Sequence, residues 1–189
     1  MPLRRTARQL DLLDRLVGLL LREGFADLTI EELASRLRCS KTTLYQLAPS
    51  KGELVTVAVR QFFRAATARV EDRIRVVDRP EQQVNAYLNA VAEELKPASQ
   101  AFLADIALFA PAREVYQRNT RRAAERVRGF IADGVRSGAF RNVNAIFVAE
   151  VVTATMTQIN SGEITERTGL SDADAYAELA SLVLHALRA

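Results

Sequence analysis

The chain has 189 residues, of which 49 % are hydrophobic and 26 % are charged, as is usual for a soluble globular protein of one or two domains. No segment approaches the roughly 20 uninterrupted apolar residues of a membrane span. Charges interrupt the N-terminus where a signal peptide would be apolar, and a single cysteine excludes an internal disulfide. We therefore expect a cytoplasmic protein without a membrane partner.

The net charge of +3 is confined to the N-terminal part of the chain. Residues 1–52 carry 9 basic and 6 acidic side chains, whereas residues 53–189 carry 17 of each. A local positive excess is the electrostatic footprint of a nucleic-acid-binding segment. Arg4, Arg5 and Arg8 precede or open the first predicted helix, 7–23, and form either a DNA-binding arm or a solvated tail.

Two short helices are predicted after Gly24, which suits the end of the first helix. Thr29 and Glu32 have the spacing of a capping box, which starts one short helix. Ser40 suits the N-cap of the other, 41–47, so that residues 38–40 form a turn. Two short helices joined by such a turn are typical of a helix-turn-helix, whose second helix enters the major groove of DNA.

The second short helix has side chains suited to DNA. Lys41, Thr42 and Thr43 near its N-terminus can donate to phosphates and base edges. Lys51 adds a positive charge to the N-terminus of the next helix, which itself favours an anion. Capped short helices and charged turns also occur in helical proteins that bind no DNA, so the pattern alone leaves both interpretations open.

Several short motifs in a fixed order carry a family resemblance over residues 8–58. They are Gly24-Phe25, Leu28-Thr29-Ile30, Glu31-Glu32-Leu33-Ala34, Ser40-Lys41-Thr42-Thr43-Leu44-Tyr45 and Ser50-Lys51-Gly52-Glu53-Leu54. In these the chain resembles the TetR (tetracycline-repressor-like) family of bacterial transcriptional regulators. The resemblance implies an all-α fold with a three-helix DNA-binding domain, 1–52, and a helical domain, 53–189, that dimerises and binds a small-molecule effector.

The resemblance also implies which residues contact DNA, with Tyr45 and Lys51 as phosphate ligands. The full set is Thr29, Ser40, Lys41, Thr42, Thr43, Tyr45 and Lys51. The chain departs from the family pattern in the turn, where Arg38 and Cys39 replace the usual Gly-Val. If the backbone of Arg38 has a positive φ, that residue is strained, because it lacks the freedom of glycine. Residues 47–49 also replace a common aromatic pair.

Helical periodicity continues through the rest of the chain, with no sign of strands. The predicted helices are 51–77, 80–95, 98–109, 111–137, 143–160 and 172–188, and residues 161–170 are predicted to be a polar loop. The last two helices are apolar nearly all round, so one side of each needs a partner beyond the chain's own core. A two-fold homodimer is the simplest partner. Its predicted interface residues are Val148, Val152, Met156, Ile159, Leu179, Val183 and Leu187.

The helices between residues 51 and 137 supply large apolar and aromatic residues that could line an effector pocket. These residues are Phe62, Phe63, Tyr87, Phe102, Ile106, Phe109 and Tyr116. The alternative is that they are simply core residues. An effector can release DNA only if it prefers the conformer with wrongly spaced recognition helices.

Enzymatic chemistry finds little support in the sequence. The one histidine is His185, no cluster has metal-ligand spacing, and no glycine-rich phosphate loop is present. We expect no catalytic residues, no metal and no cofactor. Cys39 is either a redox-sensitive thiol with a lowered pKa or a small packing residue.

The sequence thus predicts a regulator, most simply a repressor, that binds double-stranded DNA at a near-palindromic operator as a homodimer and is released by a small-molecule effector. The alternative is a helical dimeric adaptor or ligand-binding protein without operator binding.

Overall fold

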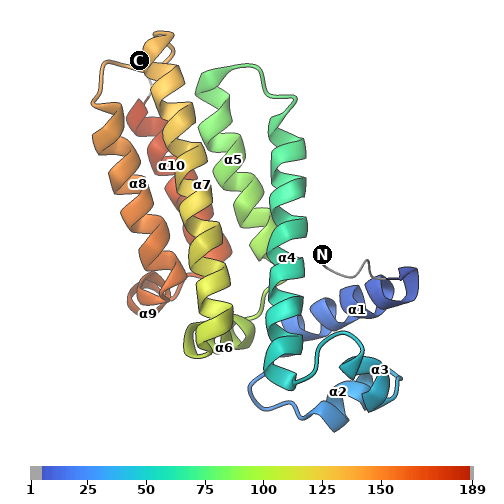
Figure 1. Cartoon of the computed structure of the whole chain (residues 1–189). Helices are drawn as coiled ribbons and strands as arrows, with labels where there is room; N and C mark the ends of the chain where they lie inside the picture. Colours follow the sequence, from blue (N-terminus) through green and yellow to red (C-terminus); the bar gives the residue numbers. More distant parts are fainter. Residues whose placement is uncertain (1–5, 188–189) are drawn as a thin grey trace. The chain divides into compact units, whose positions relative to one another are not determined.

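The computed structural model describes residues 6–187, apart from the side chains of residues 80 and 81, and contains helices but no strand in this range (Figure 1). The predicted all-α fold is confirmed. The helices are α1 (Ala7–Glu23), α2 (Ile30–Arg36), α3 (Lys41–Tyr45), α4 (Lys51–Ile74), α5 (Pro80–Leu95), α6 (Gln100–Leu108), α7 (Ala110–Arg136), α8 (Ala145–Asn160), α9 (Glu163–Thr168) and α10 (Asp172–Leu187). None of these described helices combines the length and apolarity needed to cross a bilayer. Arg4 and Arg5 of the predicted basic arm lie outside the described residues.

Three helix predictions need correction. Helix α4 ends at Ile74 rather than at residue 77. Helix α3 ends at Tyr45 rather than at residue 47, and Leu47 N–H bonds to the Leu44 carbonyl in a tightened turn. Pro49 follows closely and disfavours helical backbone at the residue before it. The predicted loop 161–170 contains the short helix α9, which an ion pair of 3.5 Å between Glu163 and Arg167 supports. This segment has no apolar periodicity, which is why the pattern misses it.

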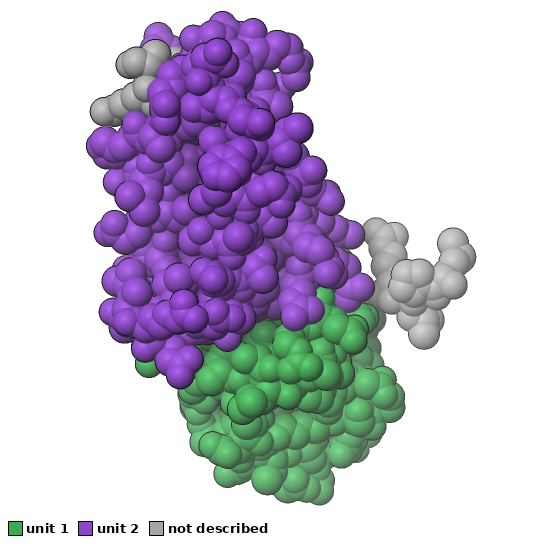
Figure 2. Space-filling view, turned by 90° about the vertical axis from the view of Figure 1, so that its left-hand side faces the viewer, with its two compact units in different colours: residues 1–64, 97–115 green, residues 65–96, 116–189 purple. Residues whose placement is uncertain are grey.

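The chain divides into two compact units, shown in different colours in Figure 2. Unit 1 comprises residues 1–64 and 97–115, and unit 2 comprises residues 65–96 and 116–189. The predicted boundary between residues 52 and 53 falls within the first turn of α4, and that helix is continuous through it. The division into domains 1–52 and 53–189 therefore stays a prediction about function.

Unit 1 has a core of leucines from the predicted DNA-binding helices. Leu13 and Leu16 of α1, Leu33 of α2, Leu44 of α3 and Leu54 of α4 are almost completely buried. Helix α1 also packs against α6, and the Ser99 N–H that precedes α6 donates to the Leu21 carbonyl at 2.8 Å. Helix α6 is thus part of the same compact unit as the short helices.

Unit 2 is a helical bundle in which α10 packs against α5 and α8. Tyr87 of α5 packs on Phe130 of α7, with their ring centroids 5.6 Å apart. The buried Tyr116 of α7 donates its hydroxyl proton to Asp172 Oδ2 at 2.8 Å. Burial raises the pKa of Asp172, although the bond from Tyr116 partly offsets this effect. A carboxylate at the start of α10 is therefore held inside the bundle by a specific donor.

Candidate nucleic-acid interface

The start of α2 is fixed by the predicted capping box, which is confirmed. Thr29 Oγ1 accepts from the Glu32 N–H at 3.2 Å, and Glu32 Oε2 accepts from the Thr29 N–H at 2.7 Å. The Thr29 hydroxyl also donates to Glu32 Oε2 at 2.8 Å. Because this hydroxyl uses its only donor hydrogen at the start of α2, donation to a DNA phosphate would have to replace the bond to Glu32.

The turn between α2 and α3 has the hydrogen bonds of a Schellman motif. The Arg38 N–H donates to the Ser35 carbonyl at 3.0 Å, and the Cys39 N–H donates to the Ala34 carbonyl at 2.9 Å. This motif needs a left-handed residue, and Arg38 occupies that position with φ of 51°, unlike any other non-glycine residue between 6 and 187. The strain expected for arginine at this position is therefore present.

Cys39 lies beside this strained residue and is half-buried. Burial raises the pKa of the Cys39 thiol, and the nearby Arg15 lowers it only in part. A redox-sensitive thiol has a lowered pKa. The structure therefore favours the packing role over the redox role.

Helix α3 presents polar side chains on one side and buries apolar ones on the other. Lys41 and Thr42 are exposed, and Tyr45 is 46 % exposed, whereas Leu44 is fully buried. The Ser40 hydroxyl caps the helix by accepting from the Thr43 N–H at 3.1 Å. The N-terminal turn of α3 thus offers its donors to solvent, as a recognition helix requires.

Lys41 is engaged with α2 in the free protein. Its Nζ donates to Glu31 Oε1 at 2.8 Å. This hydrogen bond lowers the pKa of the Glu31 carboxyl and raises the pKa of the Lys41 ammonium. Both side chains are exposed, so Lys41 can exchange this partner for a phosphate or a base at small cost.

Lys51 is the first residue of α4 and is half-buried. Its Nζ donates to the Ala26 carbonyl at 2.9 Å. An ammonium has three donors, so this bond leaves others for a phosphate. The Ser50 hydroxyl accepts from the Glu53 N–H at 3.2 Å and so caps the start of α4.

The helices α2 and α3, with the turn between them, form the predicted helix-turn-helix, and α2 packs directly on α3. A family model described as "Bacterial regulatory proteins, tetR family" matches residues 12–58, which include both helices, the turn and the start of α4. Residues 12–58 therefore match the N-terminal domain of the TetR family. No curated protein matches the sequence.

The fold of the whole chain is that of TetR-family regulators. A TetR transcription regulator from Haloarcula marismortui has 20 % sequence identity and a TM-score of 0.75, with 96 % of this chain and 99 % of that chain covered. A putative transcriptional regulator from Saccharomonospora viridis, in complex with choline, has 18 % identity and a TM-score of 0.75, with 97 % and 98 % covered. PfmR from Thermus thermophilus has 20 % identity and a TM-score of 0.65, with 94 % and 99 % covered.

The residues predicted to line an effector pocket are divided between the two units. Unit 1 holds Phe62, Phe63, Phe102, Ile106 and Phe109, and unit 2 holds Tyr87 and Tyr116. In unit 1 the Phe62 and Phe102 rings pack edge to face at 6.0 Å, and Phe102 packs in the same way on Phe25 at 6.2 Å. All seven except the half-buried Phe109 are buried. Their role as an effector site stays a prediction.

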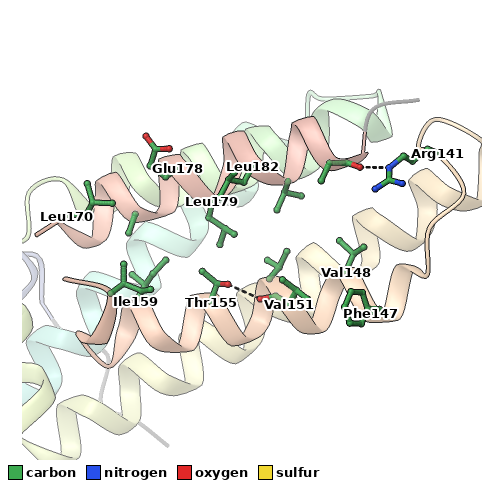
Figure 3. Close-up of a pocket in the computed structure, with 15 residues that line it drawn as sticks. Arg141, Phe147, Val148, Val151, Thr155, Ile159, Leu170, Glu178, Leu179 and Leu182 are labelled. Carbon is green, nitrogen blue, oxygen red and sulfur yellow. Dashed lines mark hydrogen bonds between the residues drawn. The ribbon is translucent and has the colours of Figure 1, made fainter. Parts of the chain in front are cut away.

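The residues predicted at the dimer interface lie on α8 and α10, where a groove of about 470 Å³ opens between the helices (Figure 3). Figure 3 shows Leu179 of α10 and Ile159 of α8 directed into the space between the two helices. The residues of the predicted set that line the groove are Val148, Val152, Ile159, Leu179 and Val183. The other two, Met156 and Leu187, are buried in the core of their own chain.

The prediction omitted the most exposed apolar residues of the same helices. Phe147 is 67 % exposed, Val151 is 48 % exposed and Leu182 is 68 % exposed, and all three line the rim of the groove. Because both helices are apolar nearly all round, the sequence does not distinguish their inner side from their outer side. Asp105 was also omitted, since no local pattern connects it to the DNA-binding helices.

Proposed function

We propose that this TetR-family protein is a cytoplasmic transcriptional repressor that binds a near-palindromic operator as a homodimer and releases it when a small molecule binds. The observation that carries the proposal is the exposed N-terminal turn of α3 close in sequence to Lys51, within a domain that matches the TetR family. Phosphate contacts supply most of the affinity of such proteins and make it dependent on salt. The proposal involves no catalysis.

The proposed DNA contacts divide into two kinds. Lys41, Thr42 and Thr43 read base edges in the major groove, while Tyr45 and Lys51 bind phosphates. Ser40 and Thr29 act mainly by capping α3 and α2, because their hydroxyls already take part in the capping bonds. In a two-fold dimer the two copies of α3 would meet half-sites roughly 34–36 Å apart or a multiple of it.

We further propose that the dimer forms on the outer side of α8 and α10. Phe147, Val151 and Leu182 are large apolar residues exposed along the rim of one groove. A monomeric protein seldom leaves such a surface in contact with water. A second copy of the same two helices covers it and completes a four-helix bundle.

The effector proposal is supported by the choline complex of the Saccharomonospora viridis regulator, which has the same fold. A resorcinol complex of RolR, at 14 % identity and a TM-score of 0.56, gives a second instance of a small organic ligand. By analogy, the effector of this protein is a small organic molecule that reaches the aromatic residues predicted above.

The central test is selection of bound sequences from random duplex DNA by the purified protein. We expect a two-fold symmetric motif. Lys51→Ala and Tyr45→Ala should each weaken binding to that motif several-fold. Lys51→Ala should also reduce the slope of log K against log salt by about 0.9, whereas Tyr45→Ala removes a neutral donor and should leave the slope unchanged. Lys96→Ala is the matched control and should bind DNA like the wild type. Lys96 is an exposed lysine at the C-terminal end of α5, where it pairs with Glu93. Equal binding by wild type and by both N-terminal variants contradicts the proposed interface.

The dimer is tested by Leu182→Glu, which places a charge on the proposed contact surface. We expect the variant to sediment as a monomer at concentrations where the wild type is a dimer, with unchanged helix content by circular dichroism. Val76→Glu is the control, because Val76 is 80 % exposed and lies after α4, away from the rim of the groove. A dimeric Leu182→Glu protein contradicts the proposed surface.

A further inference from the structure

Asp105 of α6 binds the turn between α1 and α2, which lies 80 residues earlier in the chain. Its Oδ2 accepts from two consecutive backbone N–H groups, those of Phe25 and of Ala26, the latter at 2.8 Å. Gly24 precedes them with φ of 76°, and a Cβ at this residue would lie 2.6 Å from the same carboxylate oxygen. The turn is therefore shaped to receive this carboxylate.

The same turn binds Lys51 on its other side. The Ala26 N–H bonds to Asp105, and the Ala26 carbonyl accepts from Lys51 Nζ at 2.9 Å. Asp105 therefore holds the backbone N–H of Ala26, and the backbone carbonyl of the same residue orients the ammonium of Lys51. This ammonium is the one proposed to bind a DNA phosphate.

Apolar contacts hold the same elements together. The Phe25 ring packs edge to face on Phe109, with centroids 6.0 Å apart, and Phe109 lies 3.3 Å from where a Cβ at Gly52 would be. All these residues, with Lys51 and Asp105, line one cleft of about 360 Å³ in unit 1. The start of α4, the turn after α1 and the end of α6 therefore meet at one place.

We infer that Asp105 is a positioning residue for DNA binding. It holds the turn 24–26 in place and, through Ala26, it orients the ammonium of Lys51. The inference rests on the proposed function. Without Asp105 the turn loses its two-donor anchor, and the freed Lys51 side chain must be ordered when DNA binds. Ordering a long side chain costs enough to weaken binding by about three- to tenfold.

Electrostatics alone predicts the opposite sign. A carboxylate near the DNA-binding surface repels phosphates, so its removal should strengthen DNA binding if charge were its only effect. Asp27 provides the matched comparison. It lies one residue after Ala26, is exposed, and has no hydrogen bond or ion pair among the described residues.

The experiment measures the affinity of Asp105→Ala, Asp105→Asn and Asp27→Asn for a fluorescent duplex with the selected motif, and for a mixed-sequence duplex in dilute salt. We expect Asp105→Ala to bind both duplexes about three- to tenfold more weakly than the wild type. Asp105→Asn keeps an oxygen that can accept the two N–H bonds. Its affinity for DNA should therefore lie between those of Asp105→Ala and the wild type. Asp27→Asn should bind as well as the wild type or better.

A double-mutant cycle tests whether Asp105 acts through Lys51. In the Lys51→Ala background, Asp105→Ala should cause little further loss of affinity. Lys51→Ala should lower the salt slope by about 0.9, whereas Asp105→Ala should keep the wild-type slope, because Lys51 still meets its phosphate at an ordering cost. A merely structural Asp105 would weaken DNA binding equally in the wild-type and the Lys51→Ala backgrounds, and this result overturns the inference. Melting by circular dichroism confirms folding. If Asp105→Ala does not fold, the charge-matched pair Asp105→Asn and Asp27→Asn decides, and equal affinities overturn the inference.

The two proposals fail differently. If the wild type binds neither duplex, the proposed function is overturned and the inference with it. If the wild type binds and Lys51→Ala is weaker, but Asp105→Ala binds as tightly as the wild type, only the inference is overturned.

Discussion

Replacing Arg38 by glycine should stabilise the protein, because this residue has φ of 51° in the turn before α3. A left-handed backbone costs a non-glycine residue about 1–2 kcal/mol. The greater freedom of glycine in the unfolded chain offsets about 0.4–1 kcal/mol of that gain. The expected net increase in the free energy of unfolding is therefore about 0.8 kcal/mol, within a range of about 0–1.6 kcal/mol, and the central value corresponds to about 2–3 °C in Tm for a chain of this size.

The matched control is Arg38→Ala, which removes the guanidinium but keeps the Cβ that causes the strain. Urea unfolding followed by circular dichroism should show a higher midpoint for Arg38→Gly than for Arg38→Ala, with equal slopes. Equal gains in the two variants would mean that the guanidinium, and not the backbone, is unfavourable. A loss of stability in Arg38→Gly would mean that the arginine side chain makes a contact that outweighs its strain.

The same pair separates stability from DNA binding. Arg38 is exposed and lies three residues before Lys41, so both substitutions remove one positive charge near the proposed DNA surface. We expect the two variants to lose affinity equally, whereas only the glycine variant gains stability. A glycine variant that is both more stable and tighter in DNA binding would contradict this separation.

Three further predictions concern buried or strained positions. Gly24→Ala should destabilise the protein by at least about 1 kcal/mol, because φ is 76° and the new Cβ meets Asp105. Gly18→Ala inside α1 should instead stabilise it by about 0.5–1 kcal/mol. A thermal melt in which Gly24→Ala is the more stable of the two variants contradicts the geometry. Tyr116→Phe should cost about 1–3 kcal/mol in urea unfolding, because the buried Asp172 loses a donor, while Tyr45→Phe on the surface should change little. Asp172 has a folded pKa above its ordinary 3.8, so the folded protein binds this proton more tightly and the free energy of unfolding falls as pH rises from 3.8 through the raised pKa. Asp172→Asn should remove that part of the decline above pH 3.8, and an unchanged pH profile of the free energy of unfolding would show that the pKa of this carboxyl is not raised in the folded protein.

Local signals predicted the DNA-binding helices well. The capping bonds of Thr29 and Ser40 join residues three apart, so both partners can be recognised in one short stretch of sequence. Two helix ends follow from residues with special backbone properties. Proline has a fixed φ that suits the first turn of a helix, as at Pro80 of α5, and glycine readily adopts a positive φ, as at Gly24 after α1. The strain at Arg38 can be predicted only conditionally, because the residue type can be read from the sequence but its φ cannot.

Contacts between residues far apart in the sequence cannot be predicted from such local signals. Asp105 lies in a short helix predicted mainly from its apolar residues, and its bonds to Phe25 and Ala26 span about 80 residues of sequence. A lone acid on such a helix is usually a solvated residue. Only the fold brings it to the turn beside Lys51.

The helices α8 and α10 show why the buried residues of a predicted interface are poor choices for testing it. Their apolar sequence indicates two apolar sides, and the structure assigns Val152 and Leu179 largely to the chain's own packing and Leu182 to the exposed side. Truncating a buried residue such as Val152 would lower the free energy of unfolding and would lower association as well, since folded helices are needed to associate. A charge at Leu182 changes association without removing a core contact. For a dimer built on these helices, the exposed rim therefore gives a measurement that the buried residues cannot give.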